Sequence, residues 1–214
     1  ETATDEQKKI QDKMTETLEK HGSLLLEAGV ATNKYKALGK AVSNHAAKKT
    51  KERFLILSSG NEVEMRIGKN IKNAVYFEKE DHYISPKRFW KFVERSKHSD
   101  GETAFIMKIL LWLHATREGL KEELTLQTEE RNLWEFVNHE HWSCKDEKAF
   151  YSQAKEKIKT AQILIGNHNV LTELLFEDPF LKNIDHIAIV EADKLEDNMR
   201  RAVTRSYSYR HLEK

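Results

Sequence analysis

The sequence predicts an α/β protein whose parallel sheet is interrupted by a large helical insertion. Short apolar runs bounded by glycine, serine or charged residues are the first observation, because such runs are typical of buried strands. They lie at residues 24–26, 54–57, 162–165 and 186–190. A helix-like stretch at residues 34–51 separates the first two runs, and strand, helix, strand is the opening of a parallel sheet. Residues 62–160 contain little that is typical of strands, which predicts a helical block inserted between strands of one sheet.

The helices are predicted from periodicity and from their end signals. Ile10, Met14 and Leu18 recur every four residues, which predicts an amphipathic helix from residue 5 to residue 20 that ends before Gly22. Within the middle block, three amphipathic helices are expected, over residues 86–96, 103–116 and 145–160. We therefore expect three parts: the first portion of the sheet domain at residues 1–60, the helical insertion at 61–160, and the rest of the sheet domain with the start of a following region at 161–214.

Composition limits the class of protein. The 36 basic and 35 acidic residues nearly balance, which neither requires nor excludes a nucleic-acid partner. The single cysteine, Cys144, excludes an intramolecular disulfide and fits a reducing compartment. No apolar run approaches about 18 residues and no signal-like N-terminus is present, so we expect a soluble, cytoplasmic protein without membrane contact.

The segment from Leu24 to Tyr35 has the layout of a phosphate-binding loop with altered chemistry. In a G-x-x-x-x-G-K-[ST] loop, backbone N–H groups surround the phosphates, the lysine reaches the terminal ones and a hydroxyl holds Mg²⁺. Lys34 retains the lysine, whereas Asn33 replaces the glycine and Tyr35 replaces the metal-binding residue. The alternative interpretation of Lys34 is a solvated surface lysine.

A second motif follows the last apolar run. In nucleotide-hydrolysing domains, an aspartate at the end of such a strand orients Mg²⁺ and the next glutamate positions the attacking water. Here Val190 occupies the aspartate position and cannot bind a metal, while Glu191 retains the position of the glutamate. Glu191 is therefore the candidate catalytic residue, with a helix-capping carboxylate as the alternative.

Several further segments follow one another in an informative order. Gln7 lies twenty residues before the Glu27-Ala28-Gly29 sequence, and Leu55-Ile56-Leu57-Ser58-Ser59 forms a later strand end. Residues 79–89, 163–171 and 191–197 continue the pattern. Together they resemble the DinG-like branch of superfamily 2 DNA helicases, relatives of XPD, and particularly the Gram-positive proteins without an iron–sulfur cluster. The departures from the family pattern are Thr4, Asn33, Tyr35, Val190 and Asp193.

The resemblance implies a RecA-like (P-loop) sheet domain that binds ATP and Mg²⁺ and acts on single-stranded DNA together with a second motor domain or a partner protein. It implies nucleotide contacts at Gln7, Glu27, Ala28, Gly29, Thr32 and Lys34, and contacts to the DNA backbone at Ser58 and Ser59. Ser85 stands where the family has its first cluster cysteine, and one cysteine is too few for an iron–sulfur cluster. We expect a catalytically impaired motor-domain portion; the alternative is a helicase-derived scaffold that binds other proteins.

Basic and aromatic residues also alternate within the insertion. Lys87, Arg88 and Lys91 are candidates for contact with single-stranded DNA, because cations along the backbone and aromatic rings on the bases commonly hold it. A solvated helix face is the alternative. His139, His141 and Cys144 lack the spacing of a zinc motif, so no metal site is predicted.

Overall fold

The computed structural model describes residues 4–29, 32–139, 149–171 and 183–204 and divides the chain into two compact units. The sheet unit comprises residues 1–77 and 161–214, and the helical unit comprises residues 78–160. None of the described helices is both long enough and apolar enough to cross a bilayer.

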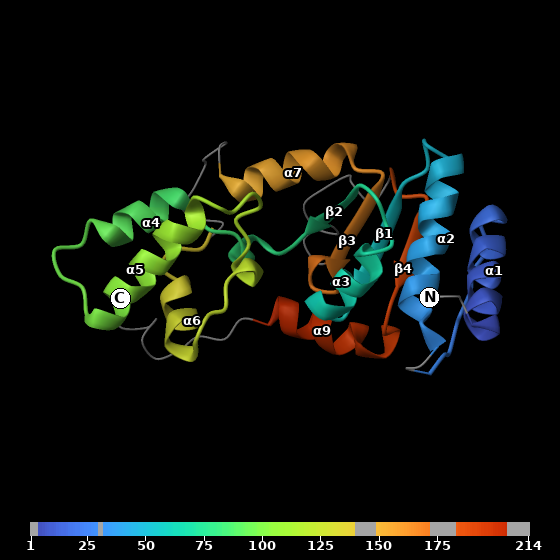
Figure 1. Cartoon of the computed structure of the whole chain (residues 1–214), viewed down its shortest axis with the longest axis horizontal. Coiled ribbons are helices and arrows are strands. Elements are labelled where there is room, and N and C mark those ends of the chain that lie inside the picture. Colours follow the sequence, from blue (N-terminus) through green and yellow to red (C-terminus); the bar gives the residue numbers. More distant parts are fainter. Residues whose placement is uncertain (1–3, 30–31, 140–148, 172–182, 205–214) are drawn as a thin grey trace. The chain divides into compact units, whose positions relative to one another are not determined.

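The sheet unit contains four parallel strands, which confirms the predicted α/β class with a parallel sheet (Figure 1). Their order is β2-β3-β1-β4. The strands are β1 (Phe54–Ser58), β2 (Ala74–Phe77), β3 (Ile163–Asn167) and β4 (His186–Ile189). Leu55 pairs with Leu164 on one side and with Ile187 on the other, so β1 is central, and all of its residues are buried. A strand buried on both faces is continuously apolar, which is why the sequence revealed β1 and β3.

Helices cover one face of this sheet. The sheet unit contains α1 (Asp5–Glu19), α2 (Lys34–Lys48), α3 (Asn61–Gly68) and α9 (Leu195–Val203), with a short 3₁₀ turn at Ala192–Lys194. α2 and α3 bury Leu38, Val42 and Ile67 against Ile56 and Ile165 of the strands. α1 packs on α2, as Figure 1 shows at the blue end of the chain. The helix at residues 5–20 is thus confirmed, and α2 begins at the predicted residue.

The helical unit has its own core. It contains α4 (Pro86–Val93), α5 (Asp100–Leu113), α6 (Thr128–Trp134) and α7 (Phe150–Thr160), with 3₁₀ turns at Glu80–His82 and Lys121–Glu123. Phe89, Phe92, Phe105 and Trp134 are buried together. Of the helix predicted at residues 145–160, the first four positions lie outside the described residues, as do His141 and Cys144.

Two strand predictions were wrong. Residues 24–26 are extended but pair with no strand in the described parts of the chain, and Leu25 is 95% exposed. Their apolar character alone could not show this, because a strand also needs a neighbour to pair with. Conversely, β2 was missed because it has only four residues and is mostly half-exposed. Residues 61–77, which we assigned to the helical insertion, instead supply α3 and β2 to the sheet unit.

Candidate nucleotide site

A cavity of about 890 Å³ lies within the sheet unit between β4 and the extended segment that follows α1. Residues 21–28, the start of α2 and residues 185–193 contribute most of its lining. It runs along the edge strand β4 as far as its carboxyl end and reaches the N-terminus of α2. In open parallel sheets, ligands bind outside the carboxyl ends of the strands, and a helix N-terminus favours anions.

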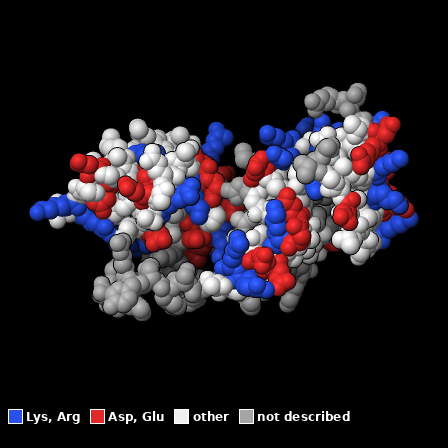
Figure 2. All heavy atoms as spheres, turned by 90° about the horizontal axis from the view of Figure 1, so that it is seen from below, with Lys and Arg blue, Asp and Glu red and all other residues white. Residues whose placement is uncertain are grey.

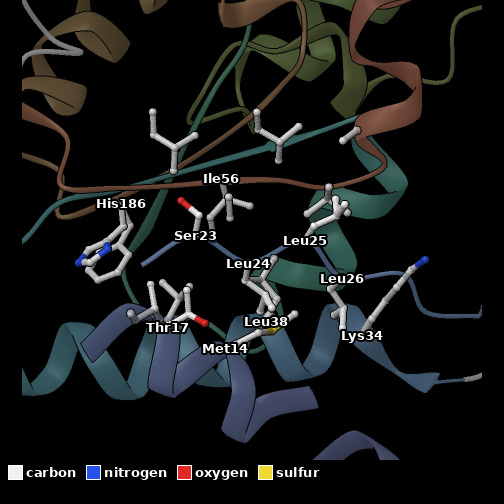
Figure 3. Close-up of a pocket in the computed structure, with 18 of the residues that line it drawn as sticks. Met14, Thr17, Ser23, Leu24, Leu25, Leu26, Lys34, Leu38, Ile56 and His186 are labelled. Atoms are coloured by element: carbon white, nitrogen blue, oxygen red, sulfur yellow. The ribbon is translucent and has the colours of Figure 1, made fainter. Parts of the chain in front are cut away.

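The middle of the cavity is apolar. Figure 3 shows Leu24 and Leu26 pointing toward the helices, near Leu38 and Met14, whereas Leu25 points to the opposite side. This alternation is that of a strand, although these residues pair with none of the described strands. On the other wall, β4 is an edge strand that leaves Ile187 and Ile189 exposed at 55% and 41%.

The predicted phosphate loop is held by its own hydrogen bonds. Lys34 lines the cavity, and its Nζ donates to the carbonyl oxygen of Ala28 at 2.9 Å. Thr32 is buried, and its hydroxyl donates to the carbonyl oxygen of Gly29 at 2.8 Å. Asn33 precedes α2 with φ of 52°, the left-handed conformation that glycine adopts most readily in such loops. Lys34 therefore lies at the N-terminus of α2, where any incoming phosphate must compete with the Ala28 carbonyl group for its ammonium.

Glu191 is the centre of a polar network at the same edge. Its Oε1 accepts from the Tyr35 hydroxyl at 2.7 Å, and its Oε2 accepts from the Ser59 hydroxyl and, at 2.6 Å, from Lys194 Nζ. Lys194, Ser59 and Tyr35 together lower the pKa of Glu191 to about 2. Burial, together with the Glu191 charge, raises the pKa of Tyr35 to about 12. A general base is most effective when its pKa lies near the working pH, so Glu191 in this network is a weak base.

The Mg²⁺ implied by the resemblance does not fit these residues. Val190 packs against the sheet core where a carboxylate would be needed, and the Tyr35 phenol is engaged by Glu191. The only carboxylate of the network is already paired with Lys194, whereas Mg²⁺ sites use oxygen ligands such as carboxylates.

His168 connects the strand ends behind this network. It is fully buried, its backbone N–H donates to the Ser58 carbonyl oxygen, and its Nε2 donates to the Val190 carbonyl oxygen at 3.0 Å. Desolvation lowers the pKa of His168, so the ring is neutral and its Nδ1 accepts from Asn198. The histidine thereby fixes the backbone from which Glu191 projects.

The remaining predicted contacts are dispersed. Gln7 is buried, its Nε2 has no hydrogen-bond partner in the described structure, and it does not line the cavity that contains Glu27, Ala28 and Lys34. Ser58 is buried and donates to Glu64, whereas the Ser59 hydroxyl reaches Glu191.

On α4, Lys87 and Lys91 are exposed beside Trp90, which is 50% exposed. Arg88 instead donates to Asn138 and to the carbonyl oxygen of Glu135, an intramolecular role within the helical unit. Figure 2 shows acidic and basic residues interspersed over the visible face, without a large surface of one sign.

Two members of the Glu191 network were missed from the sequence. Tyr35 was interpreted only as the loss of a metal-binding hydroxyl, since nothing in the sequence places it beside a residue 156 positions away. Lys194 had a signal, because a lysine three residues after a glutamate commonly pairs with it. In comparisons with known proteins, no family model matches this chain and no curated protein matches it.

Proposed function

We propose that this chain is the N-terminal motor-domain portion of a DinG-like ATP-dependent DNA helicase, in which the cavity binds a nucleotide phosphate without efficient hydrolysis. The observation that carries the proposal is the position of Lys34, at the N-terminus of α2 and in a cavity that extends to the carboxyl end of β4 in a parallel sheet. The cavity volume of about 890 Å³ falls within the range of small-molecule sites.

Impaired hydrolysis follows from the chemistry of the same edge. Val190 offers no metal ligand. Three hydrogen bonds keep the Glu191 carboxylate ionised and engage both of its oxygens. Binding of a phosphate by charge requires only Lys34 and the helix N-terminus, whereas turnover requires an organised metal and water.

A non-catalytic scaffold is the second candidate. The scaffold is favoured because Lys34 and Glu191 already form hydrogen bonds with neighbouring protein groups, namely the Ala28 carbonyl group and Lys194. A scaffold of this kind would bind neither nucleotide nor DNA through these residues.

The test is titration with a fluorescent ATP analogue, with and without Mg²⁺. The Lys34→Ala variant is compared with Lys40→Ala, a change on the same helix at a residue that does not line the cavity. Loss of a charge-assisted hydrogen bond should weaken binding at least about tenfold in Lys34→Ala and leave Lys40→Ala unchanged. Equal affinities for the two variants, or no saturable binding by the wild type, would refute nucleotide binding and favour the scaffold.

A separate experiment addresses DNA. The wild type and the double variant Lys87→Ala/Lys91→Ala are titrated with a labelled single-stranded oligonucleotide over a range of salt concentrations. If both lysines contact phosphates, the slope of log affinity against log salt falls by about 1.4, at about 0.7 per phosphate contact. Lys9→Ala/Lys13→Ala is the matched control, because these lysines are exposed on α1 with the same spacing. An equal change in both double variants would contradict a site on α4.

A further inference from the structure

Three histidines and one glutamate converge at the amino end of the sheet, at the opposite end of the cavity from Lys34. His21 follows α1, His45 lies in the last turn of α2, Glu52 lies in the loop before β1, and His186 is the first residue of β4. Figure 3 shows His186 at this end of the cavity. All four belong to the sheet unit, yet they come from four separate segments of the chain.

Each of the three histidines directs a ring nitrogen at the Glu52 carboxylate. The Nε2 atoms of His45 and His186 each lie 2.8 Å from Oε2 of Glu52, and Nε2 of His21 lies 3.9 Å from its Oε1. The ligand atoms of His21, Glu52 and His186 all lie within 4.8 Å of one another. The His21 and His186 rings are stacked, with centroids 5.0 Å apart and an interplanar angle of 13°, so the exposed His21 ring must rotate before both imidazoles can direct a lone pair at one ion.

Burial makes this arrangement more than a chance surface cluster. His45 and His186 are exposed by only 3% and 9%, and Phe54 packs against both rings. Glu52 is 18% exposed, whereas the His21 side chain is 59% exposed and lies on the open side. The site therefore has two buried imidazoles, a carboxylate between them, and one accessible imidazole that can close over a ligand.

We propose that His21, His45, His186 and Glu52 form a binding site for a divalent transition metal, with Zn²⁺ as its best match. Zn²⁺ binds histidine nitrogen and carboxylate oxygen, usually as four ligands in a tetrahedron. Bonds of about 2.0–2.1 Å to such ligands place neighbouring ligand atoms about 3.3 Å apart. The histidine-to-carboxylate separations of 2.8 and 3.9 Å bracket this value, whereas the ligand atoms of His21, Glu52 and His186 together extend to 4.8 Å, so the exposed His21 side chain must turn inward to complete the coordination sphere.

The hydrogen bonds of His45 and His186 are compatible with metal binding. Oε2 of Glu52 faces Nε2 of both His45 and His186 at 2.8 Å, and a carboxylate in such bonds acts as the acceptor. Each of these rings therefore carries a proton on Nε2. On metal binding, each neutral ring gives up its Nε2 proton to solvent and takes one up on Nδ1, which frees the Nε2 lone pair for the metal and leaves the number of bound protons unchanged.

A metal here would act as a structural clip. It would join the end of α1, the end of α2 and the start of β4, and thereby fix the helix that precedes the extended segment lining the cavity. This role is independent of nucleotide binding, because the site lies at the opposite end of the sheet from Lys34 and Glu191.

The test uses the full chain without an affinity tag, stripped with a chelator and titrated with Zn²⁺ against a chromophoric chelator. We expect one Zn²⁺ per chain, a rise in thermal stability on binding, and, with Co²⁺, the visible absorption bands of a tetrahedral complex. His21→Ala should weaken binding at least about 100-fold, because even the loss of an outer-shell partner costs 10- to 100-fold. His21 is exposed, so this variant should keep its fold.

Three further variants sharpen the result. Glu52→Gln retains the shape of the carboxylate but loses its charge, and should also weaken binding. His114→Ala, an exposed histidine on the helical unit, and Cys144→Ser should leave the isotherm unchanged. The proposal is overturned if the stripped wild type takes up no Zn²⁺ in the titration. It is also overturned if His21→Ala binds Zn²⁺ as the wild type does, or if Cys144→Ser abolishes binding.

Discussion

The hydrogen bond between Tyr35 and Glu191 joins the start of α2 to the end of β4, and its removal should be measurable. The two oxygens are 2.7 Å apart and the acceptor is ionised, so the bond belongs to the charge-assisted class. Such bonds contribute about 1.5–3 kcal/mol. Because Glu191 would retain Ser59 and Lys194, Tyr35→Phe should destabilise the sheet unit by about 1.5 kcal/mol, at the lower end of that range.

The stabilisation by the Tyr35–Glu191 bond should be lost at both acid and alkaline pH. The folded pKa of Glu191 is about 2, below its ordinary value of 4.5, so the stabilisation is present above pH 4.5 and is lost as the pH falls toward 2. The folded pKa of Tyr35 is about 12, above its ordinary value of 10.0, so the stabilisation is also lost as the pH rises from 10 toward 12. Denaturant unfolding of both proteins across the pH range measures the difference.

Two controls make this experiment decisive. Tyr76→Phe removes a phenol from β2, a strand that does not adjoin β4, and should not show the loss between pH 4.5 and pH 2; because burial also raises the pKa of Tyr76, this comparison is made below pH 10. A double-mutant cycle with Glu191→Gln should give a coupling energy of about 1.5 kcal/mol between Tyr35 and Glu191. A destabilisation that is equal at about pH 3 and about pH 7, or a coupling energy near zero, would refute the reasoning.

Two other changes test the packing of each unit by thermal or denaturant unfolding. Gly39→Ala should destabilise the sheet unit by about 1–3 kcal/mol, because a Cβ there would lie 2.8 Å from the Ile67 carbonyl oxygen and 2.9 Å from the Asn70 Cβ. Gly101→Ala, which meets nothing within 4 Å in the first turn of α5, should instead stabilise by about 0.5–1 kcal/mol, and the same sign for both would contradict the packing argument. Ser99→Ala should cost the helical unit about 1 kcal/mol, because Ser99 and Glu102 form a reciprocal cap at the start of α5. The exposed Ser96→Ala change is its control and should have no comparable effect.

The sequence predicted those parts of the fold that depend on neighbouring residues. The apolar runs of β1 and β3 stand out because both faces of these strands are buried, and α4 begins at the predicted residue 86, where the Ser85 hydroxyl accepts from the Arg88 N–H. Residues 24–26 have the same apolar character, but pairing depends on a partner strand that local sequence does not reveal. β2 was missed because its four residues carry too short a pattern.

The site was only partly predictable for the same reason. Lys34 and Glu191 were predicted because the loop and strand-end motifs are local, and the structure brings both to the lining of one cavity. The hydrogen bond that sets the chemistry of Glu191 joins it to Tyr35, a residue distant in sequence. The bond between His186 and Glu52 in the histidine cluster is of the same long-range kind. Resemblance could place a residue in a motif, but only the fold shows which partners surround it.

The exposed edge of β4 has a consequence for handling the protein at high concentration. A strand edge offers unpaired backbone groups to any extended segment of another molecule, and Ile187 and Ile189 add apolar surface beside them. The carboxylates beside this edge give it little repulsive charge, because Glu191 is paired with Lys194 and Asp185 accepts from the Arg53 N–H. Self-association through β4 should therefore depend on backbone pairing and apolar burial and change little with ionic strength, unlike that of a protein whose aggregation depends on attraction between opposite charges.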